Sequence, residues 1–117
     1  MPALMTAAQL VPVARTLLRT HGARGARPED LAQALAQGRP HGLGDGETLC
    51  QEGAPSVSLF VLLRGSVRVT RLDSSGTQRE LAQVSAPALI GHMGLVDGST
   101  RSASCMAIGD VLSLIHI

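Results

Sequence analysis

The stretch LIGHMGLVDGSTRSAS, residues Leu89 to Ser104, combines the features of an anion-binding loop. Gly91 and Gly94 let the backbone approach a ligand without interference from a Cβ atom. The letters MGLV are enough for one helical turn, whose free N–H groups would point at an anion. Arg101 offers a planar guanidinium that holds two phosphate oxygens at once, and the three residues after it are small. The pattern predicts a phosphate cradle; spacing alone also allows a surface loop with an exposed arginine.

Short strands are expected on both sides of this stretch. TLCQEG, SLFVLLRG, SVRVTRL and RELAQVS precede it, and RSASCMAI and DVLSLIHI follow it, with glycine, proline, serine or aspartate between them. Gly65-Ser66 is predicted to be a tight hairpin turn between two strands, and DSSGTQ a longer turn. Many short strands at regular spacing indicate a mainly β fold of the sandwich or roll type.

The N-terminal segment, residues 1–42, has helical patterns instead. A first helix is predicted between Thr6 and Thr20, with Pro12 marking its start. The segment GARGARP ends it, and PEDLAQALAQG predicts a second helix from Pro28 to a stop at Gly38. The apolar residues of the first helix recur at helical spacing: Leu10, Val13, Leu17 and Leu18.

Length and composition exclude several classes of protein. The chain has 117 residues, enough for one domain, and its only aromatic residue is Phe60. It therefore lacks the aromatic platform on which single-stranded nucleic acid stacks. A net charge of +1 gives no long-range attraction to DNA or anionic lipid, so we expect no direct nucleic-acid site. The apolar runs fall short of the ~20 residues of a membrane span, and a secretory signal is missing, so we expect a cytoplasmic protein or module.

Neither the cysteines nor the histidines have the spacing of a metal or catalytic site. Cys50 and Cys105 form no CxxC pair; reduced buried thiols are favoured, and a single disulfide remains possible. His21, His41 and His116 have no common spacing, so we expect no metal. No serine has the context of a nucleophile, so we expect no catalytic residue and no enzyme activity.

From about Leu43 to Met106 the chain resembles the cyclic nucleotide-binding domain family, the sensor module of the catabolite activator protein and of kinase regulatory subunits. DGETLCQEG resembles the entry strand and turn of that family, LFVLLRGSVRV its hairpin, and LIGHMGLVDGSTRSAS its phosphate-binding cassette. The resemblance implies a jelly-roll-like β-roll over residues 43–117 with a short cassette helix, after an N-terminal helical extension over residues 1–42. It also implies regulation by cyclic AMP or cyclic GMP, bound as a ligand, with no other cofactor.

The resemblance also implies roles for individual residues. Arg101 would hold the cyclic phosphate, helped by the backbone N–H groups of Ser102 or Ala103. Gly91 and the helix after it would line the ribose, and a strand before the cassette would lie beside the base. The implied ligand-binding residues are Leu81, Ala82, Gly91, His92, Met93, Gly94, Arg101, Ser102 and Ala103.

Two departures from the family pattern bear on ligand binding. His92 stands where the family has a glutamate that accepts a hydrogen bond from the ribose hydroxyl. Such a charge-assisted bond contributes ~1.5–3 kcal/mol, although a neutral imidazole nitrogen could still accept it. Pro87-Ala88 replaces the usual Gly-Asp before the cassette. The alternatives are therefore a degenerate module for interaction or dimerisation, or the sensor part of a larger enzyme, transporter or transcription regulator.

The C-terminal residues carry a separate hypothesis. In the family, helices follow the β-roll, and a homodimer could form through them; here the chain stops at DVLSLIHI. The last residues, LSLIHI (112–117), also match the translation of a transposon-derived sequencing adapter. We interpret them as an adapter that replaces a longer native continuation; the alternative is a genuine edge strand, because Val111, Leu112, Leu114 and Ile115 could pack.

Overall fold

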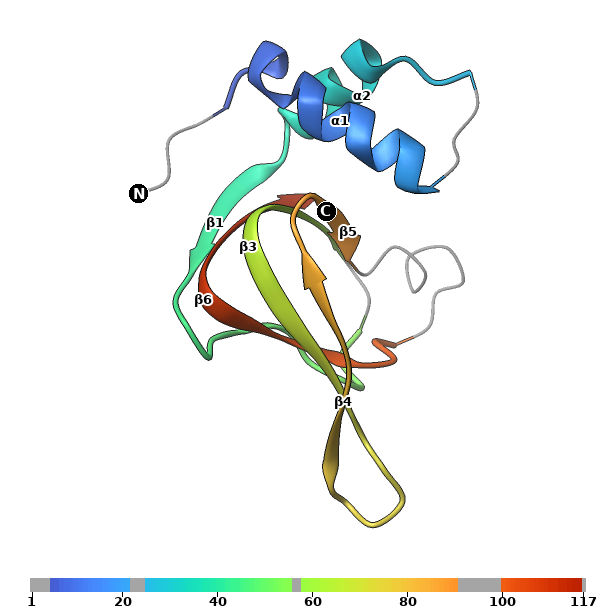
Figure 1. Ribbon diagram of the computed structural model, residues 1–117, viewed down its shortest axis with the longest axis vertical. Helices are drawn as coiled ribbons and strands as arrows, with labels where there is room; N and C mark the ends of the chain where they lie inside the picture. The colour runs from blue at the N-terminus through green and yellow to red at the C-terminus, as the bar shows by residue number, and fades with distance from the viewer. Residues whose placement is uncertain (1–4, 22–24, 56–57, 91–99, 117) are drawn as a thin grey trace.

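Two long antiparallel strands, β3 (Leu59–Leu72) and β6 (Ser104–His116), pair along their length at the centre of the sheet (Figure 1). The computed structural model describes residues 5–21, 25–55, 58–90 and 100–116. The pairing of β3 with β6 brings together residues far apart in the chain, from Thr70 with Ser104, 34 positions apart, to Leu59 with His116, 57 positions apart. The fold therefore depends on long-range contacts.

Each long strand has two short antiparallel partners. β6 pairs with β2 (Thr48–Cys50) near its start and with β1 (Arg39–Leu43) near its end. β3 pairs with β5 (Ala88–Ile90) near its start and with β4 (Gln78–Ser85) near its end. The result is a curved antiparallel sheet from which the β3–β4 hairpin projects (Figure 1). The mainly β roll expected from the sequence is confirmed.

Glycines bend the two long strands where the sequence predicted that strands would end. The predicted hairpin at Gly65-Ser66 is wrong, and so are the two separate closing strands, because β3 and β6 each continue through a glycine. Gly65 has φ +88° and Gly109 has φ +68°, a region that other residues rarely adopt. The register between β3 and β6 shifts beside Gly65, as it does at a β-bulge, which bends a strand without ending it. A Cβ atom at Gly65 would also overlap the carbonyl oxygen of Asp110.

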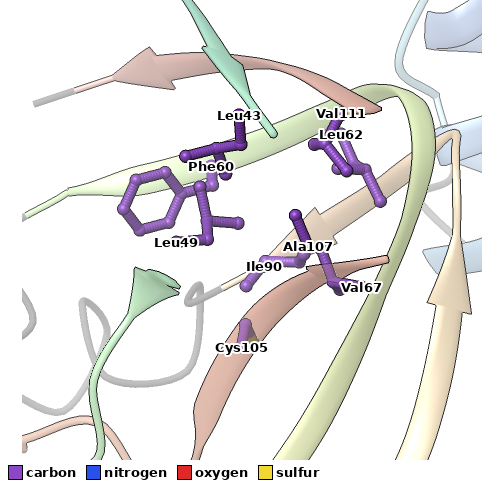
Figure 2. Packing of buried hydrophobic residues seen from close by; sticks show 9 residues of the cluster. All are labelled: Leu43, Leu49, Phe60, Leu62, Val67, Ile90, Cys105, Ala107 and Val111. Atoms are coloured by element: carbon purple, nitrogen blue, oxygen red, sulfur yellow. The ribbon is translucent and has the colours of Figure 1, made fainter. Parts of the chain in front are cut away.

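The curved sheet encloses one hydrophobic core. Its side chains come from five of the strands and lie inside the roll; most are aliphatic, and the ring of Phe60 lies at one side of the cluster (Figure 2). Burial of this apolar surface is the main force that closes the roll. The buried residues are Leu43, Leu49, Phe60, Leu62, Val67, Ile90, Cys105, Ala107 and Val111.

A second core joins the helices to the opposite face of the sheet. Side chains alternate along a strand, so Val61 points away from the face that carries Phe60 and Leu62. It packs with side chains of α1 (Ala7–His21) and α2 (Pro28–Leu35). The buried residues of this second core are Leu10, Ala14, Leu17, Ala32, Leu35, Val61 and Leu114.

The start of α1 is defined by Thr6 and not by Pro12. The Thr6 hydroxyl accepts a hydrogen bond from the backbone N–H of Gln9 at 3.2 Å, and the side-chain oxygen of Gln9 accepts one from the backbone N–H of Thr6 at 2.9 Å. This reciprocal capping box satisfies two N–H groups at the helix end. The prediction that Pro12 marks the start is therefore wrong, since Pro12 lies inside the helix. α2 begins at Pro28, as predicted.

Four further expectations concern the two ends of the chain and the cassette. β1 begins at Arg39, within the segment 1–42 that was expected to be helical. Residues 112–116 form the end of β6, which lies between β1 and β3 and is not an edge strand. The adapter origin of residues 112–117 stays a prediction. The predicted cassette helix falls in residues 91–99, outside the described residues.

Candidate ligand-binding site

The backbone of Arg101 is held against the loop that follows β2. Its N–H donates to the carbonyl of Ala54 at 2.8 Å, and its own carbonyl accepts from the N–H of Gly53 at 2.9 Å. Thr100, just before it, forms a bridge with Pro55. These contacts fix the position from which the arginine side chain projects.

The Arg101 side chain is buried beside the roll core. Only 7% of the residue is exposed. Its terminal nitrogen Nη2 donates to the carbonyl oxygen of Ser58, and its Cζ lies 5.3 Å from the centroid of the Phe60 ring. A carbonyl oxygen and an aromatic face both favour a guanidinium, and both orient it. The site therefore presents a fixed positive charge at low exposure, where its interaction with an anion is strongest.

Two of the small residues after Arg101 tie the start of β6 to its neighbours. The carbonyl of Ser102 accepts a hydrogen bond from Arg71 Nε on β3 at 2.9 Å, and the Ser104 hydroxyl accepts one from the Glu52 N–H at 2.8 Å. Ser102 is exposed and Ala103 is half-buried. The segment is therefore held from both sides and remains partly open to solvent.

Ala82 and Leu81, expected beside the base, are both exposed on β4 but differ in their place in the sheet. Ala82 pairs with Val69, which in turn pairs with Cys105, so these residues form one row across the sheet. Residues opposite each other in a sheet share a face, so Ala82 is on the face that carries the roll core. Leu81 lies at the register shift in β4 and is 53% exposed. The row that contains Ala82 therefore runs from the buried core to solvent.

Cys50 and Cys105 lie opposite each other on β2 and β6, in the same row. The pKa of Cys50 is lowered to about 7, first by a hydrogen bond from the Cys105 thiol and then by the Arg101 charge and the Cys105 backbone N–H. These interactions outweigh burial, which acts to raise the pKa. The hydrogen bond to Cys50, and then burial, raise the pKa of Cys105. The two thiols are not cross-linked in this structure.

The other expected site residues lie outside the part of the chain that the structure describes. These are Gly91, His92, Met93 and Gly94. Among the described residues, no group of three or more His, Cys, Asp or Glu side chains is arranged to hold a metal ion. None of the helices in the same residues is long and apolar enough to span a membrane.

Sequence reasoning missed the immediate surroundings of Arg101. The carbonyl of Ser58, the ring of Phe60 and the thiol of Cys50 all act on the guanidinium or are acted on by it. In the sequence, Phe60 is an isolated aromatic residue and the two cysteines are a distant pair. No local signal identifies these contacts, because they join segments that are more than forty residues apart.

Comparison with known proteins identifies the family of this chain. Residues 41–116 match the model of the cyclic nucleotide-binding domain. The chain therefore belongs to the cyclic nucleotide-binding domain family. Over 86 residues it is 31% identical to the cyclic AMP receptor protein of Thermus thermophilus, an alignment that covers 74% of this chain and 40% of that protein.

Solved structures have the same fold. The catabolite activator protein of Thermus thermophilus superposes with a TM-score of 0.73 at 30% identity, covering 80% of this chain and 44% of that one. The N-terminal domain of a transcriptional regulator from Streptomyces coelicolor A3(2) superposes with a TM-score of 0.74 at 30% identity. This alignment covers 88% of this chain and 71% of that one. A cAMP-binding acyltransferase of Mycobacterium smegmatis shares the fold, with a TM-score of 0.67 at 22% identity, covering 90% and 34%. The chain spans about 40% of the length of the curated relatives that it matches.

Proposed function

We propose that this chain is the sensor domain of a regulatory protein and that it binds a cyclic nucleotide, cyclic AMP or cyclic GMP. The observation that carries the proposal is the buried guanidinium of Arg101, oriented by the Ser58 carbonyl and the Phe60 ring. A guanidinium held in a fixed orientation at low exposure supports an anionic ligand, since charges attract each other more strongly where water is largely excluded.

Further residues are assigned to the ligand on the family pattern. Arg101 makes a bidentate contact with the cyclic phosphate, and a backbone N–H of Ser102 or Ala103 adds a hydrogen bond. Gly91, His92, Met93 and Gly94 approach the phosphate and ribose. Ala82, on the core-side face of β4, lies closer to the base than Leu81, which is at the register shift.

The domain itself is proposed to be regulatory and not catalytic. The similarity of its sequence to regulatory proteins supports this assignment. The acyltransferase of similar fold shows that an enzyme can also carry such a domain. We propose that the ligand shifts the population of conformations in a segment outside this chain, which delivers the response. An intracellular location and a dimer formed by such a segment belong to the same proposal.

Titration of the reduced chain with cyclic AMP and with cyclic GMP, followed by amide NMR, tests the proposal. We expect shifts in the residues around Arg101, and an affinity loss of about ten- to hundredfold in Arg101→Gln, because a hydrogen bond to a charged group contributes ~1.5–3 kcal/mol. Arg101→Lys keeps the charge but not the bidentate fork, so its loss is expected to be smaller. Arg64→Ala removes an exposed arginine of β3 and serves as the matched control.

The alternative of a module that no longer binds nucleotide is supported by His92 and by Pro87-Ala88. A well-dispersed spectrum that does not change at millimolar concentrations of either nucleotide would establish this alternative. Equal losses in Arg101→Gln and Arg64→Ala would instead show nonspecific attraction to positive charge and would also contradict the proposed site.

A further inference from the structure

The antiparallel pair β2–β6 places two cysteines at the separation that a disulfide requires. Cys50 is the register partner of Cys105. Directly opposite residues of an antiparallel pair have Cα atoms ~4.5–5.5 Å apart, within the ~4.4–6.8 Å that a disulfide spans. Residues opposite each other share a face of the sheet, and Cys50 packs against the roll core that contains Cys105, so both side chains lie on the same side of the pair. A cross-link therefore needs only a small local adjustment.

The two cysteines differ in exposure. Cys105 is 5% exposed, lies in the roll core and is flanked on its other side by Val69. Cys50 is half-buried, at the last residue of the short strand β2, next to a turn. A small reagent from solvent therefore reaches Cys50 first, and Cys105 is held behind it.

The surroundings of Cys50 also favour its thiolate. The Cys105 thiol, the Arg101 charge and the Cys105 backbone N–H lower the pKa of Cys50 to about 7, against the opposing effect of burial. The thiolate is the nucleophilic form of cysteine, and reactive cysteines are found in positively charged, partly exposed sites. The pKa of Cys105 is raised, by its hydrogen bond to Cys50 and by burial, so Cys50 is the thiol of the pair that ionises first.

We propose that Cys50 and Cys105 form a redox-active pair, in which a hydroperoxide oxidises Cys50 and Cys105 then closes a reversible intramolecular disulfide. This inference does not depend on nucleotide binding, because it rests on the pairing of two strands and on the exposure of the two thiols.

The reaction has two steps that balance. The Cys50 thiolate attacks one oxygen of the hydroperoxide; an S–O bond forms, the O–O bond breaks, and the other oxygen leaves as an alcohol or water after taking a proton. Cys50 is then a sulfenic acid. The Cys105 sulfur attacks the Cys50 sulfur while its proton goes to the departing oxygen, so an S–S bond forms, the S–O bond breaks and water leaves. The cysteines together lose two electrons, and the hydroperoxide gains them.

Intact-mass measurement of the full chain after treatment with hydrogen peroxide tests the pair. We expect a monomer that has lost two hydrogen atoms, that does not react with iodoacetamide after unfolding, and that returns to the original mass with a dithiol reductant. In Cys105→Ser the reaction is expected to stop at a sulfenic acid on Cys50, which a 1,3-dione reagent traps. In Cys50→Ser, Cys105 is expected to stay reduced at the same dose.

A second measurement uses only the unmodified sequence, so it does not depend on whether the variants fold. The rate at which iodoacetamide alkylates Cys50 in the folded chain is expected to level off above a midpoint near pH 7, matching the lowered pKa of Cys50. In the unfolded chain the rate should continue to rise through ~8.5, the ordinary pKa of cysteine.

Three results would overturn the proposal: two alkylatable thiols after peroxide treatment, oxygen added to Cys50 while Cys105 stays reduced, or disulfides that form only between chains.

Discussion

At the scale of single residues, the site depends on one buried cation and on the groups that orient it. Arg101 is held by the Ser58 carbonyl and lies over the Phe60 ring, while its charge reaches the Cys50 thiol. A guanidinium surrounded in this way has few alternative rotamers, so less conformational entropy is lost when it binds an anion. We infer that preorganisation of Arg101, and not the net charge of the chain, gives the proposed site its affinity.

His92→Glu restores the acceptor of the family pattern and is expected to tighten cyclic nucleotide binding by about ten- to hundredfold, because a charge-assisted hydrogen bond to the ribose is regained. Isothermal titration calorimetry measures the change. His92→Gln, which adds only a neutral acceptor, is the control and should give a smaller gain. Unchanged affinity in His92→Glu would show that His92 does not face the ribose.

At the scale of elements, the bend of β3 needs glycine at one position for two reasons. Gly65 combines φ +88° with a close approach to the Asp110 carbonyl, whereas Gly76 has φ +84° with no heavy atom near its missing Cβ. Gly76→Ala is expected to cost about 1–2 kcal/mol for the backbone conformation alone. Gly65→Ala should cost more, because the strands must also move apart. Urea unfolding of both variants makes the comparison, and equal costs would contradict the role assigned to the Gly65 contact.

The β3–β4 hairpin has a turn whose stability depends on pH. The Ser75 hydroxyl, Arg79 and the Thr77 N–H hydrogen-bond to Asp73 and lower its pKa to about 2. A lowered folded-state pKa stabilises the folded chain above the unfolded pKa of ~3.9, and this contribution is lost as the pH falls toward 2. Asp73→Asn should therefore lower the thermal midpoint slightly at pH 6, with the difference from the parent chain disappearing near pH 2.

Asp110→Asn is a control for this effect, since it removes an exposed carboxylate outside the hairpin. Thermal unfolding followed by circular dichroism between pH 2 and pH 7 measures both variants. A difference between Asp73→Asn and the parent that stays constant down to pH 2 would show that the carboxylate charge is not the cause.

At the scale of the whole molecule, the helices and the roll share a core and are expected to unfold together. Leu17 of α1 is 2% exposed and belongs to the cluster that contains Val61 of β3 and Leu114 of β6. Leu17→Ala should cost about 2–5 kcal/mol, as does truncation of other buried leucines. Leu18→Ala, at a half-buried position beside it, should cost less.

Thermal unfolding followed by helical circular dichroism and by the methyl resonances of Val67 tests this cooperativity. We expect both signals to change at one midpoint that moves down in Leu17→Ala. Loss of the helical signal while the Val67 resonances persist would show instead that the helices are an independent unit.

Several local features of this protein, namely a helix start, a strand and the family motif, could be predicted from its sequence. The predicted second helix starts at Pro28, the strand RELAQVS is β4, and the order of glycines and Arg101 in LIGHMGLVDGSTRSAS indicated the family. These features are local, since caps, alternation and motif spacing act over a few residues. The functional roles of the cassette residues remain predictions.

Tertiary structure alone decided where the long strands bend and what surrounds Arg101. A glycine followed by a polar residue predicts a turn. At Gly65, however, strand β3 continues, because β6 pairs with it on both sides of the bulge. Cys50 opposite Cys105 likewise follows from strand register, and Phe60 beside Arg101 follows from the hydrogen bonds that hold Arg101 against the loop after β2. Register is set by which side chains the whole sheet buries, so no short stretch of sequence contains it.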